Sequence, residues 1–273
     1  MTVRLLTPIR PDPRAPLAAA NPVAKLGAAA ILMATLFVSI DLLTPALVLL
    51  ALFVAVPAAG VPPPALLARA WPLLIAATAL VLLNAAFSAD RSGTLLVSLG
   101  PLDVTTGSLV AGLAVGLRVL GVALAGLLAF VTTEPTHLAD ALQQQLHLPP
   151  RVAVGALAAV RLVPSIAAEW QILRLARRAR GVSAGRSPLA AVRIFAGQLL
   201  SLLVSAIRRA TRLATAMEAR GFGSRSCRTV ARITRMQRGD WLLLAASVLV
   251  GAAVIGLGMA LGSWRFLFAA VAR

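Results

Sequence analysis

The chain has 273 residues, of which 59% are hydrophobic, and a formal net charge of +17. Soluble domains are about 45–50% apolar, so the excess of apolar residues predicts a membrane protein. A basic charge could also indicate nucleic-acid binding, but aromatic residues make up only 4% of the chain and tyrosine is absent, so we expect no nucleic-acid partner. The only cysteine, Cys227, excludes an intrachain disulfide, and with just two histidines, His137 and His147, we expect no metal site.

Residues 1–22 form an N-terminal arm. It carries Arg4, Arg10, Arg14 and several prolines without a compact apolar core, so it does not resemble a cleavable signal peptide. We expect this arm to lie in the cytoplasm, because basic residues flanking a first span favour that side of the membrane.

Residues 23–132 contain four apolar runs that predict four transmembrane helices. Only Asp41 separates the first two runs, and a single helix across both would be about 55 Å long, too long for a hydrocarbon core of about 30 Å. A break is therefore predicted near Asp41–Pro45. A polar connection over Ala89–Thr106 joins the third run to the fourth. The four runs are Val23–Ile40, Leu42–Ala59, Ala70–Ser88 and Gly107–Thr132.

A fifth span, Trp241–Gly262, is predicted in the last part of the chain, 241–273. Between the fourth and fifth spans, residues 133–240 contain most of the 26 Lys and Arg residues. The positive-inside rule places this segment in the cytoplasm. Five spans put the two ends of the chain on opposite sides of the membrane, and the tail after the last span contains few basic residues.

The segment 133–240 is predicted to form three helices. The first begins at Pro135, the second covers Arg151–Arg180 and the third covers Pro188–Arg220. The third helix is amphipathic, with most of its arginines opposite its apolar positions, so it needs an apolar surface from the membrane side of the protein or from a partner. Those apolar positions are Leu199, Leu202, Leu203, Ala206, Ile207, Ala210, Leu213, Ala214 and Met217.

The same three residues, Ala-Arg-Gly, end both long helices of this segment. They are Ala179, Arg180 and Gly181 in the first copy and Ala219, Arg220 and Gly221 in the second. Each copy suits a helix end, because glycine adopts the left-handed conformation there and arginine favours the helix dipole. Two identical copies in one cytoplasmic segment also indicate docking, since a projecting guanidinium forms bidentate bonds to carboxylates or carbonyls.

Arg118 lies inside the fourth predicted span, where a charge costs at least about 2.5–3.5 kcal/mol. We expect it to face protein and to pair with Glu169 or with the carbonyls of a helix end, and both a structural role and a role in coupling remain open. Nearby, Gly112-x-x-x-Gly116 predicts close helix packing, within the chain rather than against a partner.

No nucleotide-binding P-loop occurs in the sequence, because no G-x-x-x-x-G-K-[ST] pattern is present. The absence of a P-loop favours a subunit whose energy is supplied by another chain, and two alternatives to this interpretation exist. A stand-alone secondary transporter would need buried carboxylates, but Asp41, Asp90 and Asp103 fall at predicted span ends. A membrane enzyme acting on a lipid-linked substrate would need a carboxylate cluster; Asp140, Glu169 and Glu218 are dispersed in sequence, although a fold could gather them.

The order and spacing of several motifs between Asn21 and Trp241 resemble the T component, the transmembrane coupling subunit, of energy-coupling factor transporters. The matching stretches are Asn21 to Leu26, Gly116-Leu117-Arg118, Thr132 to Leu142, Leu148-Pro149, Arg161 to Pro164, Glu169, Ala176 to Gly181 and Ala216 to Phe222. The two Ala-Arg-Gly copies match the signature motifs of that family.

The resemblance implies an all-α, polytopic, non-enzymatic subunit of an ATP-driven importer in a bacterial inner membrane. Two ABC ATPase subunits would bind ATP and Mg, so that this chain needs no cofactor, and Arg180 and Arg220 would each contact one of them. A membrane-embedded S component would bind a vitamin or other micronutrient. The amphipathic helices would support that S component within the lipid bilayer.

Overall fold

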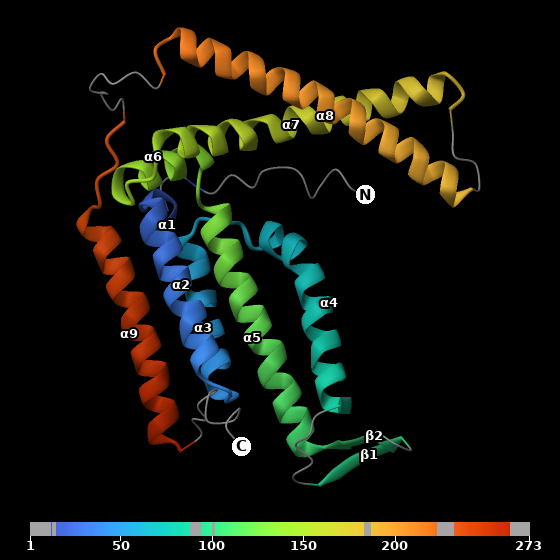
Figure 1. Cartoon of the computed structure of the whole chain (residues 1–273). Coiled ribbons are helices and arrows are strands. Elements are labelled where there is room, and N and C mark those ends of the chain that lie inside the picture. The colour runs from blue at the N-terminus through green and yellow to red at the C-terminus, as the bar shows by residue number, and fades with distance from the viewer. Residues whose placement is uncertain are drawn as a thin grey trace. The chain divides into compact units, whose positions relative to one another are not determined.

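The computed structural model describes residues 12, 15–87, 94–99, 102–182, 187–222 and 232–262. Within these residues the regular elements are helices apart from one small hairpin, which confirms the all-α fold class (Figure 1). The chain divides into two compact units, one made of segments 1–141 and 234–273 and the other of segment 142–233. The predictions for Arg4, Arg10, Arg14, Asp90 and Cys227, and for the tail after Gly262, lie outside the described residues.

The first unit is a bundle of apolar helices that lie side by side in Figure 1. Its elements begin where the sequence supplies helix starts: Asn21 accepts a hydrogen bond from the Val23 amide at 2.9 Å, and the Thr105 side chain accepts one from the Ser108 amide at 3.2 Å. The helices are α1 (Pro16–Ala19), α2 (Pro22–Val38), α3 (Leu43–Ala58), α4 (Pro63–Phe87), α5 (Thr106–Val131) and α9 (Arg238–Ala260).

A polar turn separates α2 from α3 and confirms the predicted break near Asp41–Pro45. Asp41 accepts hydrogen bonds from the Ser39 hydroxyl and, at 3.1 Å, from the Thr44 amide. The turn leaves α2 with 17 residues and α3 with 16. These helices are therefore about 26 Å and 24 Å long, shorter than the apolar runs that predicted them.

A two-stranded antiparallel hairpin, β1 (Leu95–Leu99) and β2 (Leu102–Thr105), lies at the ends of α4 and α5 (Figure 1). The polar connection predicted for Ala89–Thr106 thus contains a hairpin that was not predicted. Two short runs rich in Leu and Val flank Gly100-Pro101 in the sequence, and such runs around a turn signal are typical of a hairpin.

Five described helices are long and apolar enough to cross a membrane: Ala70–Phe87 within α4, then α5, α9 and the two long helices of the second unit. This set differs from the five predicted spans. The helices α2 and α3, which were predicted to span the membrane, are too short to be included, whereas the two long helices 150–179 and 188–219, which were predicted to lie in the cytoplasm, are long enough and apolar enough to be included. Length and composition alone therefore do not distinguish spans from amphipathic helices in this chain.

Helix α5 is the centre of the first unit and packs against α2, α3 and α4. Its small residues permit this: a Cβ added at Gly112 would lie 2.6 Å from the Val81 carbonyl oxygen of α4, and one at Gly116 would overlap the Val81 side chain. The prediction that Gly112-x-x-x-Gly116 packs within the chain is confirmed. The apolar core beside it includes Leu36, Val48, Leu52, Leu124 and Leu128.

The second unit consists mainly of two long helices, α7 (Pro150–Ala179) and α8 (Pro188–Ala219), which cross each other (Figure 1). Both begin with proline at the first helical position, and the Ser187 side chain caps α8. The shorter α6 (Pro135–Gln145) precedes them, and its residues up to Ala141 belong to the first unit. The three helices predicted in segment 133–240 are therefore confirmed.

Candidate functional site

The two Ala-Arg-Gly copies form the same turn at the ends of α7 and α8. Gly181 and Gly221 both have φ of 76°, in the left-handed region. The Val182 amide donates to the Arg177 carbonyl at 3.0 Å, and the Phe222 amide donates to the Met217 carbonyl at 2.9 Å. Together with the glycine amide bonds to Arg178 and Glu218, these contacts make each turn a Schellman motif. The predicted helix-ending role of the two glycines is confirmed.

Arg180 and Arg220 occupy the cap position of their turns, and both side chains are exposed. Within the described part of the chain, neither guanidinium forms a hydrogen bond or an ion pair. The two turns lie at opposite ends of the crossed helix pair (Figure 1). The second unit therefore presents two identical cationic turns, well separated from each other, each free to bind an acceptor on another molecule.

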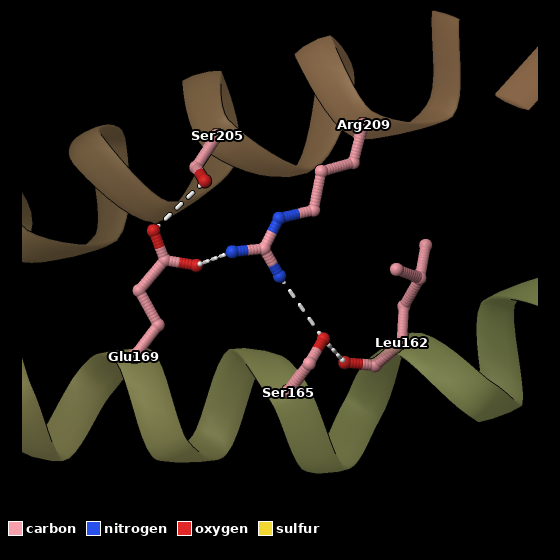
Figure 2. A network of polar contacts seen from close by, with 5 residues as sticks. All are labelled: Leu162, Ser165, Glu169, Ser205 and Arg209. Atoms are coloured by element: carbon pink, nitrogen blue, oxygen red, sulfur yellow. Dashed lines mark hydrogen bonds and ion pairs between the residues drawn. The ribbon is translucent and has the colours of Figure 1, made fainter. Parts of the chain in front are cut away.

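A polar network joins α7 and α8 where they cross, as Figure 2 shows. Arg209 donates to Glu169 at 2.7 Å and to the Ser165 hydroxyl at 3.1 Å, and the Ser205 hydroxyl donates to Glu169 at 2.8 Å. The Ser165 hydroxyl in turn donates to the Leu162 carbonyl at 2.8 Å. This network was not predicted, although Ser165 with Glu169 and Ser205 with Arg209 each have the i, i+4 spacing that places two side chains on one face.

At the crossing, α8 contacts α7 through the polar residues Ser205 and Arg209 as well as through apolar residues, which differs from the expectation for an amphipathic helix. Leu202 and Gln198 are buried, whereas Leu199, Leu203 and Ile207 are 54%, 54% and 55% exposed. The carboxylate and hydroxyl groups of α7 satisfy the polar side of α8 at the crossing. Most of the predicted apolar positions of α8 are therefore not covered by α7.

Different surroundings flank the network on its two sides. Toward the first turn the helices touch: Trp170 and Phe195 pack edge to face with ring centres 5.3 Å apart, and Arg177 donates to the Ile194 carbonyl at 2.9 Å. Toward the second turn a groove of about 490 Å³ opens between the helices. It is lined by Arg151, Val154, Gly155, Ala158, Ala159 and Leu162 of α7 and by Ala210, Leu213, Ala214, Met217, Glu218 and Phe222 beside α8's end.

Arg118 lies in α5 and points at the C-terminal end of α2. Its Nε donates to the Leu36 carbonyl at 2.8 Å, and its Nη2 donates to the Ser39 carbonyl. The predicted pairing with a helix-end carbonyl is confirmed. The alternative partner, Glu169, is wrong, because the carboxylate of Glu169 is held by Arg209 and Ser205 in the other unit.

A second buried polar cluster, which was not predicted, joins the start of α2 to the end of α5 and to α9. The Lys25 ammonium donates to the carbonyls of Ala18 and Thr132, each at 2.8 Å, and the Lys25 residue is 5% exposed. The Asn21 amide donates to Asp240 at 2.7 Å. The sequence signal for this cluster is limited to the stretch Asn21 to Leu26, which resembles a family motif.

A membrane enzyme would need several carboxylates in one site. The three candidates lie on three different helices: Asp140 on α6, Glu169 on α7 and Glu218 on α8. No group of three potential metal ligands comes together in the described ranges.

Comparison with known proteins agrees with these features. The sequence profile of a family described as "CbiQ: Cobalt transport protein" matches residues 13–229. The chain is similar to the energy-coupling factor transporter transmembrane protein EcfT of Listeria innocua serovar 6a, with 33% identity over 170 residues, which is 59% of this chain and 64% of the relative. The protein of the same name from Lacticaseibacillus paracasei is 35% identical over 162 residues, 56% of this chain and 61% of the relative.

A third protein of that name, from Bacillus subtilis, is 32% identical over 150 residues, 52% of this chain and 57% of the relative. The chain thus aligns with less than two thirds of the length of each of these relatives. Its apolar helices and these similarities make it a multi-pass membrane protein. Because the profile covers most of the sequence, the chain belongs to the CbiQ family of transport proteins, which confirms the resemblance to transmembrane coupling components.

Proposed function

We propose that this protein is the transmembrane coupling subunit of an energy-coupling factor importer. It transmits the motion of two ABC ATPase subunits to a membrane-embedded S component that takes up a vitamin or other micronutrient. The observation that carries the proposal is the pair of identical turns that expose Arg180 and Arg220 at opposite ends of one helix pair. Two equivalent cationic turns suit two equivalent partners, such as the halves of an ATPase dimer.

The charges of α7 and α8 support a cytoplasmic location for the second unit, despite the length of both helices. Four arginines and a carboxylate lie along α8, and α7 carries six charged residues, whereas α5 carries only Arg118. A charge in the bilayer centre is expensive unless it is paired, and most of these arginines are exposed. The helices therefore suit the cytoplasmic surface of a bacterial inner membrane, with the uncovered apolar face of α8 toward lipid or the S component.

In this proposal the ATPase subunits bind ATP and Mg, and the present subunit has no catalytic role and no cofactor of its own. The similarity to proteins named EcfT supports this assignment. A stand-alone secondary transporter remains the first alternative and predicts transport by this chain alone in liposomes. A membrane enzyme acting on lipid-linked substrates is the second, but the Glu169 carboxylate that it would use is already neutralised by Arg209.

Reversing the charge at both turns tests the proposal. The double variant Arg180→Glu, Arg220→Glu should reduce co-purification of the ATPases and substrate uptake by more than about tenfold, because two anchoring guanidinium contacts are replaced by repulsion. The folded chain should persist, since the turns depend on backbone bonds and on Gly181 and Gly221.

The matched control is Arg174→Glu, Arg212→Glu, which makes the same change in net charge at exposed positions away from the turns. This control should assemble and transport as the unaltered protein does. Full assembly and uptake by the turn variant would refute the proposed function.

A further inference from the structure

The polar network of Figure 2 lies at equal distances along the chain from the two Ala-Arg-Gly turns. Arg180 lies eleven residues after Glu169, and Arg220 lies eleven residues after Arg209. Each turn is thus about 16 Å, or three helical turns, beyond its own member of the ion pair. Neither stretch contains glycine or proline, so each is a continuous helical arm.

The network also marks the boundary between a closed side and an open side of the helix pair. On the Arg180 side, the contacts of Trp170 with Phe195 and of Arg177 with Ile194 hold the helices together. On the Arg220 side the groove separates them. The last contacts before the groove are those that Arg209 forms with Glu169 and Ser165, and the angle at which α8 leaves α7 on this side depends on them.

The chemistry of the contact between Glu169 and Arg209 allows it to define one position of the two helices and still to rearrange. The hydrogen bonds between a carboxylate and a guanidinium are directional, so they fix where α8 lies along α7, which an apolar contact does not do. Ser205 and Ser165 provide further hydrogen bonds to the two charged groups. The side chains are only partly buried, with 27% of Glu169 and 40% of Arg209 exposed. Water can therefore replace the protein partners when the angle changes, without leaving a buried charge.

Resting on the proposed function, we propose that Glu169 and Arg209 are positioning residues that form the pivot of the coupling helices. They set the crossing angle of α7 and α8 and thereby the separation of Arg180 and Arg220. Because the two arms have equal length, a change in the angle displaces both turns equally. Two equivalent ATPases bound at the two turns would then move by the same distance as the crossing angle changes.

The crossing angle can be measured in the chain alone by electron–electron distance spectroscopy. Spin labels at Ala156→Cys and Ala216→Cys, both exposed and outside the groove lining, report the open side once Cys227 is replaced by serine. The variants Glu169→Gln and Arg209→Gln should broaden the distance distribution. The milder variant Ser205→Ala should broaden it less, because it removes one hydrogen bond and leaves the ion pair.

The assembled transporter supplies the second measurement, which is the amount of substrate taken up per ATP hydrolysed. Glu169→Gln and Arg209→Gln should lower this ratio by about two- to fivefold, while the ATPases stay bound. The charge swap Glu169→Arg, Arg209→Glu should restore both the ratio and the distance distribution, since each serine hydroxyl can donate or accept. A merely stabilising contact would change the yield of complex but not this ratio.

Arg212→Gln is the matched control: it removes an exposed arginine from the turn of α8 next to Arg209 and should alter neither measurement. The pivot is refuted if the variants at Glu169 and Arg209 behave like this control, or if the ratio falls while the distances stay unchanged. A charge swap that folds but restores neither quantity also refutes it. If the unaltered chain binds no ATPase, the proposed function fails, while the distance measurement still decides whether the pivot exists.

Discussion

Arg118 shows how one charged residue is accommodated in the middle of an apolar helix. It lies opposite the turn that ends α2, and its guanidinium supplies donors to the Leu36 and Ser39 carbonyls, which have no partner within the helix. Close to it, Asp41 is held by Ser39 and Thr44. The arginine, the carboxylate and the helix end satisfy one another, so the charge does not meet lipid.

Replacing Arg118 by methionine should destabilise the protein by about 2–3 kcal/mol, because the two carbonyls lose their donors in a site without bulk water. The measurement is the midpoint of thermal denaturation in detergent. Arg174→Met, at an exposed position of α7, is the control and should leave the midpoint nearly unchanged. Equal midpoints for the two variants would show that Arg118 does not hold the end of α2.

At the scale of elements, α2 and α3 form a short hairpin against α5. Lys25, near the start of α2, bonds to Thr132 just after the end of α5, and Leu36, near the end of α2, bonds to Arg118 in the middle of α5. The turn between α2 and α3 therefore lies beside the midpoint of α5. The remaining part of α5, from Thr106 to Leu117, packs on α4 instead, and there the close approach depends on Gly112 and Gly116.

The packing of α4 on α5 should be sensitive to a single added methyl group. Gly112→Ala and Gly116→Ala should each lower stability by about 1–3 kcal/mol, because the new Cβ would overlap the Val81 backbone or side chain. The control is Gly256→Ala in α9, where an added Cβ meets no atom within 4 Å. In that position alanine should be neutral or stabilising, since it favours the helix. A similar loss at all three positions would point to a general effect of the substitution.

For the whole molecule, the proposed topology places the second unit and the β1–β2 hairpin on opposite sides of the membrane. In a chain with Cys227→Ser, a cysteine at Arg174 of α7 should react with an impermeant thiol reagent in inverted vesicles, and one at Thr94 should react in right-side-out cells. Both positions are exposed. In the proposed topology α4 and α5 each cross the membrane once, which puts the hairpin between them on the side opposite the second unit.

The opposite labelling of the α7 position would mean that α7 itself spans the bilayer, as its length of 30 residues allows. That result would contradict the cytoplasmic location of the second unit. It would leave the family membership intact, because that rests on the sequence match over residues 13–229.

The sequence by itself determined the features that depend on neighbours along the chain. The break at Asp41, the helix starts at Pro135 and Pro188, and the glycine turns at Gly181 and Gly221 were all predicted, because capping and left-handed turns are local. The same holds for the family, since its motifs are short stretches in a fixed order. Even the hairpin, which was missed, had a local signal in Gly100-Pro101.

Only the tertiary structure decided which distant groups meet. Glu169 binds Arg209 rather than Arg118, Lys25 bonds to the Thr132 carbonyl at the end of α5, and α8 contacts α7 through polar side chains at the crossing. Helical periodicity defines the faces of a helix but not which face a neighbour covers. That choice depends on crossing geometry and on the satisfaction of buried polar groups, which arise only when residues far apart in sequence are packed together.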